Sequence, residues 1–72
     1  QKKLSLKEKR ELETLETRIS ETETRLAEIE RELNLAASDA GRAHALFTEQ
    51  QTLNARLEID LERWTELADR AG

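Results

Sequence analysis

The sequence predicts an all-α fold, an antiparallel two-helix coiled-coil hairpin, with helices over residues 6–34 and 40–68. Three observations support this prediction. In each half of the chain, apolar side chains recur at alternating steps of three and four residues, which places them along one side of a helix. The 72 residues contain no Pro, and 39% of them are charged, a composition typical of long exposed helices. Residues 35–41 interrupt the pattern, so the chain is expected to fold back there.

The first helix is predicted to begin near Leu6. The residues Ser5-Leu6-Lys7-Glu8 have the form of a capping box, in which the Ser hydroxyl and the Glu carboxylate each accept a backbone N–H. Asn34 is a plausible last residue. The predicted contact residues of this helix are Leu12, Leu15, Ile19, Thr22, Leu26, Ile29 and Leu33.

The second helix is predicted to begin after Ser38 or Asp39, either of which can act as the N-cap. A connection this short favours antiparallel neighbours. The predicted contact residues of the second helix are Leu46, Gln50, Leu53, Leu57, Leu61 or Asp60, Trp64 and Leu67. One register pairs the two rows throughout, with Ile29 opposite Leu46 and Leu12 opposite Trp64. Leu4 can fold back against Trp64 or Leu67 and close the open end.

Two alternatives to the hairpin are less consistent with the sequence. A homodimer of two continuous helices would waste the capping signals at Ser38-Asp39, and the heptads are interrupted there and at Gly41. A disordered chain would not be expected to sustain the heptad pattern. Phe47 either packs over the tip of the hairpin or, together with Leu61, forms an apolar strip for a partner.

Length and composition predict one coiled-coil domain over residues 1–72. The chain begins with Gln1 rather than Met, so we expect a fragment of a longer protein. Cys is absent, and no apolar run is long enough to cross a membrane. We expect a cytoplasmic protein without membrane contact, which is a monomer with weak self-association.

The sequence offers no enzymatic site. It has no Gly-rich phosphate-binding loop, and His44 is the only histidine, without a Cys or a second His for a metal. The many Glu residues are spread over solvent faces rather than around a pocket. We therefore predict no catalytic residues, no metal site and no cofactor in this segment.

Charge is distributed unevenly along the chain. The overall net charge is −4, but residues 1–10 carry five basic residues against one acid. Basic side chains attract phosphate groups through charge and counterion release, so this segment is a candidate site for nucleic acid. The candidate residues are Lys2, Lys3, Lys7, Lys9 and Arg10, joined in the hairpin by Arg63 and Arg70.

Both ends of the chain resemble a known family. Residues 3–13, Lys-Leu-Ser-Leu-Lys-Glu-Lys-Arg-Glu-Leu-Glu, and residues 62–67, Glu-Arg-Trp-Thr-Glu-Leu, are similar to the C-terminal coiled-coil domain of ABC-F ATPases, most closely the Uup branch. The matching positions are Leu4, Ser5, Lys7, Glu8, Arg10, Glu11, Leu12, Trp64 and Leu67. The chain departs at Leu6, where the family usually has Tyr, and at the tip, Leu35–Asp39.

This resemblance implies a non-catalytic C-terminal domain of an ATPase whose ATP and Mg sites lie outside this segment. It implies DNA as a partner, with the ribosome or ribosomal RNA as further candidates. The alternative is a structural arm that docks on the parent ATPase, the ribosome or another copy. The preferred DNA structure and the coupling to ATP hydrolysis do not follow from the sequence.

Overall fold

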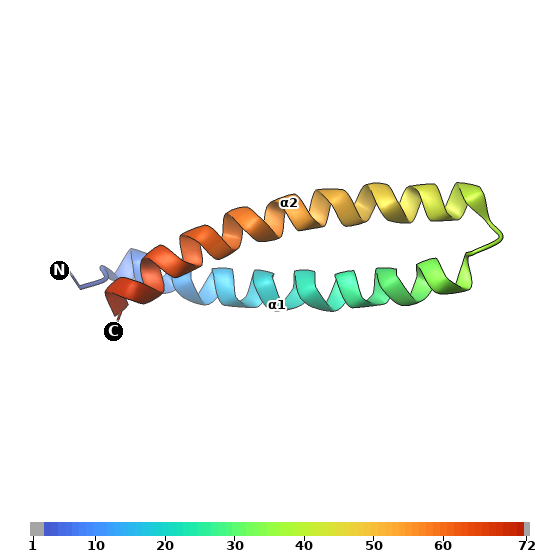
Figure 1. Ribbon diagram of the computed structural model, residues 1–72. Helices are drawn as coiled ribbons and strands as arrows, with labels where there is room; N and C mark the ends of the chain where they lie inside the picture. Colours follow the sequence, from blue (N-terminus) through green and yellow to red (C-terminus); the bar gives the residue numbers. More distant parts are fainter. Residues whose placement is uncertain (1–2, 72) are drawn as a thin grey trace.

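In the computed structural model, which describes residues 3–71, two helices lie side by side as an antiparallel hairpin (Figure 1). Helix α1 spans Leu6–Leu35 and helix α2 spans Ala40–Ala71. The hairpin measures 53 × 16 × 15 Å. The first and last described residues lie together at one end, which we call the root (residues 3–12 and 63–71) (Figure 1). The predicted fold is confirmed, although α1 ends one residue later and α2 three residues later than predicted.

Both helices begin at the predicted caps. The Ser5 hydroxyl accepts from the Glu8 backbone N–H at 3.1 Å, and the Glu8 carboxylate accepts from the Ser5 N–H at 3.0 Å, which completes the capping box. At the tip (residues 33–43), a side-chain oxygen of Asp39 accepts from the Arg42 backbone N–H at 3.0 Å. Of the two candidates for the second cap, Asp39 is therefore the one that binds a free N–H of the first turn.

The core consists of two apolar clusters, one near each end of the rod. At the root, Leu4, Leu15 and Leu67 are buried together, with Trp64 packed against them, so the predicted return of Leu4 to the open end is confirmed. Near the tip, Ile29, Ala36 and Leu46 form the second cluster. Thr22 lies between the clusters and is also buried, as its place in the heptad predicts.

The structure decides between the two alternatives for the seam of α2. Asp60 is only 3% exposed, whereas Leu61 is 40% exposed. The alternating step runs from Leu57 through Asp60 to Trp64, and Leu61 lies roughly 100° further around the helix. Of the two alternatives, Asp60 is therefore the seam residue, and this layer of the seam contains a carboxylate instead of a leucine.

Candidate functional site

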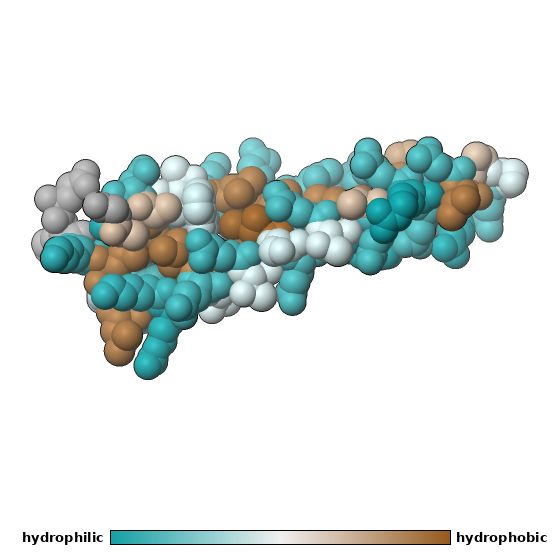
Figure 2. Space-filling model, turned by 90° about the horizontal axis from the view of Figure 1, so that it is seen from below, coloured by the Kyte–Doolittle hydropathy of each residue, from teal (hydrophilic) through white to brown (hydrophobic). Residues whose placement is uncertain are grey.

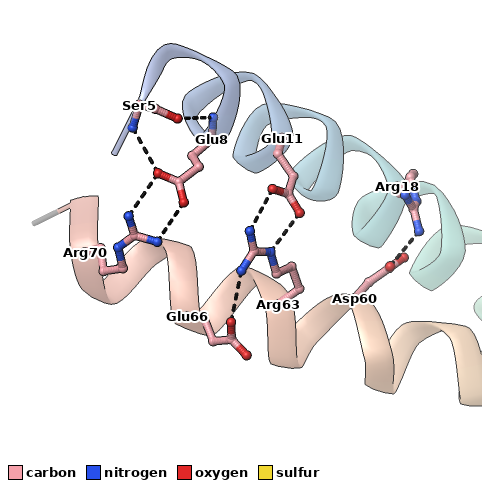
Figure 3. A network of polar contacts seen from close by, with 8 residues as sticks. All are labelled: Ser5, Glu8, Glu11, Arg18, Asp60, Arg63, Glu66 and Arg70. Carbon is pink, nitrogen blue, oxygen red and sulfur yellow. Dashed lines mark hydrogen bonds and ion pairs between the residues drawn. The ribbon is translucent and has the colours of Figure 1, made fainter. Parts of the chain in front are cut away.

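The root is held together by charged groups from both helices (Figure 3). The Arg70 guanidinium donates to both oxygens of Glu8, at 2.8 and 2.9 Å. Together with the Ser5 N–H, this pair lowers the pKa of Glu8 to about 2, and the hydrogen bond from Arg70 is the largest cause. Glu8 therefore joins the first turn of α1 to the last turn of α2.

A second ion pair lies further along the root. Arg63 donates to both oxygens of Glu11, at 2.8 and 3.0 Å, and also to Glu66 at 3.0 Å. The hydrogen bond from Arg63 lowers the pKa of Glu11, and the two carboxylates raise the pKa of Arg63. The structure thus pairs both candidate nucleic-acid residues of α2, Arg63 and Arg70, with carboxylates of the same chain.

The candidate residues of the N-terminal segment are placed differently. Within residues 3–71, Lys3, Lys7, Lys9 and Arg10 form no ion pair, and all are exposed. Lys2 lies outside the described residues. Lys3 and Lys9 share one surface hollow with Arg70, whereas Lys7 and Arg10 occupy one face of the first turns of α1 at a spacing of three residues. The root therefore presents positive charge that the described part of the chain does not neutralise.

Further cross-helix ion pairs follow along the rod. Arg25 donates to both oxygens of Glu49 on α2, at 2.7 and 2.8 Å, and also to Glu28 and Glu32 on its own helix. Its hydrogen bond lowers the pKa of Glu49, and these carboxylates raise the pKa of Arg25. Glu32 also accepts from Arg42 at 3.0 Å near the tip. Ion pairs thus connect the two helices along the rod from the root to the tip.

Arg18 and Asp60 form the most buried of these pairs. The Arg18 guanidinium donates to Oδ1 of Asp60 at 2.6 Å, with the Asp60 side chain 4% exposed and the Arg18 side chain half exposed (Figure 3). The second oxygen, Oδ2, is buried and has no hydrogen-bond partner among the described residues. A buried oxygen without a partner destabilises the fold.

The sequence analysis did not find these ion pairs. Their signal is present in the heptads, because Glu11, Arg25, Arg63 and Arg70 flank the buried rows, where opposite charges on two helices can meet. Figure 2 shows one face of the hairpin. This face is mostly hydrophilic, with apolar patches at the root, near the middle and near the tip.

No group of three or more His, Cys, Asp or Glu side chains within residues 3–71 could hold a metal ion. Neither helix, over its described length, has a stretch that is long and apolar enough to cross a membrane.

Comparisons with known proteins agree with the resemblance at the two ends of the chain. The family described as "ABC transporter C-terminal domain" matches residues 3–69. An uncharacterized ABC transporter ATP-binding protein of Bacillus subtilis (strain 168), YfmR, is 36% identical over 67 residues, which are 93% of this chain and 11% of that protein. No solved structure matches the chain. The chain belongs to the ABC transporter C-terminal domain family and forms an accessory domain of the kind carried by ABC transporter ATP-binding proteins.

Proposed function

We propose that this domain is the non-catalytic accessory domain of a Uup-like ABC-F ATPase and that its root binds DNA weakly and without sequence specificity. The observation that supports the proposal is the set of basic side chains at the root that have no ion-pair partner among residues 3–71, namely Lys3, Lys7, Lys9 and Arg10. Such groups neutralise phosphates and release counterions.

In this proposal Arg63 and Arg70 support the site rather than make its main phosphate contacts. Each is held by a carboxylate in a two-pronged ion pair, which a phosphate would have to displace. Their role is to fix the two helix ends against each other, so that the lysines on α1 are presented by a rigid element.

The experiment is fluorescence anisotropy of the 72-residue chain with labelled duplex and branched DNA over a range of salt concentrations. We expect saturable binding whose affinity falls as salt rises, with a logarithmic slope of about −3 to −4 for four neutralised phosphates. The double charge reversal Lys7→Glu with Arg10→Glu should abolish binding.

A matched control is the double reversal Arg31→Glu with Arg56→Glu, which changes the net charge equally. Both arginines are exposed on the rod and form no ion pair with the described residues. Binding that is lost equally in both double variants would show a general charge effect, and absence of binding at low salt would refute the proposal. Labelled RNA in the same assay distinguishes DNA from ribosomal RNA as the partner.

The second candidate function is a docking arm for the parent ATPase, the ribosome or another copy. It is favoured by the apolar side chains outside the two core clusters, since Phe47 is 52% exposed and Leu61 is 40% exposed. Phe47 is therefore not buried over the tip of the hairpin, whereas its neighbour Leu46 belongs to the buried cluster near the tip.

A further inference from the structure

The two sides of the hairpin differ in how they are closed. Each helix has two seam rows, and one row is buried, as shown by Leu15 and Ile29 in α1 and by Leu46 and Leu67 in α2. Because the helices are antiparallel, the two buried rows lie on the same side of the hairpin. The ion pairs of Glu11, Arg25 and Glu32 with α2 flank these buried rows. They close this side apart from one small hollow beside Thr22 and Leu53, which Arg18 and Arg56 border.

The other side is open. We define it by the half-buried residues Ile19 and Leu26 of α1 and by Leu61 and Trp64 of α2. Two hollows along it are lined by both helices, the first including Ile19, Leu61 and Trp64, and the second including Leu26. No cross-helix ion pair among residues 3–71 covers this side, and its one cross-helix hydrogen bond runs from the Trp64 indole N–H to Glu16 at 3.2 Å.

One edge of the open side is acidic. Glu16, Glu23 and Glu30 line the hollows on α1 at a spacing of seven residues and form no ion pair with any described residue. The opposite edge, on α2, presents Asn54 and Leu61, which carry no charge. From Glu16 to Glu30 the acidic edge is about 21 Å long, which equals four turns of a docked helix.

We propose that the open side binds an amphipathic helix with an apolar heptad row and a Lys or Arg at every seventh residue, forming a three-helix coiled coil. Charge complementarity favours this occupant, because its basic side chains would meet Glu16, Glu23 and Glu30 while its apolar row covers the seam between Ile19 and Leu61. A second copy of the chain has a net charge of −4 and would bring further acidic surface to this edge.

The test uses the 72-residue chain and a synthetic 21-residue peptide with Leu at heptad contact positions and Lys at the flanking positions. The matched probe has Glu in place of Lys. Trp64, the only Trp of the chain, lies on the open side, so its emission reports binding when the peptides contain no Trp. We expect a saturable blue shift with the Lys peptide and at least tenfold weaker binding of the Glu peptide.

Two pairs of variants locate the binding site. Leu61→Glu should weaken binding at least tenfold, whereas Ile59→Glu should not, because Ile59 is 66% exposed and lies roughly 200° around α2 from Leu61. Reversal of Glu16, Glu23 and Glu30 to Lys should remove the preference for the Lys peptide. Reversal of Glu21, Glu62 and Asp69 to Lys changes the net charge equally and should preserve it.

Circular dichroism at 222 nm checks that every variant keeps its helices. Equal binding of both peptides, or binding that Leu61→Glu does not weaken, would overturn the proposal, as would absence of binding. A concentration-dependent doubling of mass that Leu61→Glu abolishes would assign the open side to a second copy instead. The proposal uses a different face from the DNA site at the root, so a negative DNA titration would leave it standing.

Discussion

Replacing Asp60 with Leu should stabilise the hairpin. Asp60 occupies a seam position of the heptad, is 3% exposed, and has one carboxylate oxygen without a partner among the described residues. A buried ion pair can often be replaced by an apolar side chain without loss of stability, and sometimes with a gain. Leu at this position continues the apolar seam between Leu57 and Trp64.

The expected change in the free energy of unfolding combines four effects, two stabilising and two destabilising. Burying a Leu side chain stabilises by about 1.5–3 kcal/mol, and removing the unpaired buried oxygen adds about 1–3 kcal/mol. Loss of the bond to Arg18 costs about 1 kcal/mol because that guanidinium is half exposed and remains solvated, and imperfect packing costs about 1–3 kcal/mol. The net expectation is a gain of about 1 kcal/mol, or a rise in Tm of about 4–8 °C.

Thermal unfolding followed by circular dichroism measures this change, and sedimentation equilibrium checks that the variant keeps the mass of the parent chain. The matched control is Asp69→Leu, at an exposed position of the same helix, where we expect a change within about 0.5 kcal/mol. Arg18→Met should instead destabilise the hairpin, because it leaves the Asp60 carboxylate buried without its only partner among the described residues. An unchanged or lower Tm in Asp60→Leu would refute the reasoning and show that the ion pair with Arg18 is net stabilising.

Three further predictions concern the stability of the hairpin. Ile29→Ala should lower the free energy of unfolding by about 2–5 kcal/mol, because Ile29 is fully buried in the apolar cluster near the tip. Urea unfolding measures this change, and a decrease of less than about 1 kcal/mol would contradict the packing. Ser5→Ala should cost about 0.5–2 kcal/mol through loss of the cap, with Thr as a control that keeps the hydroxyl and most of the stability. Glu8, Glu11 and Glu49 have pKa values below that of an unfolded Glu, so the unfolded chain binds more protons as pH falls. The stability they contribute is therefore complete above about pH 4.5 and is lost as pH falls toward 2; urea titrations that show no such decline would contradict the ion pairs.

The sequence determined the fold because its signals are local and periodic. The heptad spacing predicted which side of each helix is covered, and the Ser5-Glu8 box fixed the start of α1. The end of α2 was harder to predict, because its last turn is held by the ion pair of Arg70 with Glu8, which lies 62 positions away in the chain. Such a contact leaves no local pattern near residues 68–71.

The candidate site was predicted only in part. The basic segment at residues 3–10 follows from charge counting, and the structure describes its lysines as exposed. The sequence grouped Arg63 and Arg70 with them because all approach the same end of the hairpin. The ion pairs of Arg63 and Arg70 depend on which side chains face each other across the two helices. Predicting these pairs requires the register of the two helices to the exact residue.

Charge, spacing and capping residues by themselves determined that the chain is an acidic two-helix rod with a basic segment at its N-terminal end. The tertiary structure decided which seam residues are buried, because the register selects Asp60 over Leu61 and thereby places a carboxylate in the core. It also decided that the hairpin has a closed side with ion pairs and an open apolar side. The reason is physical: periodicity defines a face of one helix, but only the packing of two helices determines which half of that face is covered.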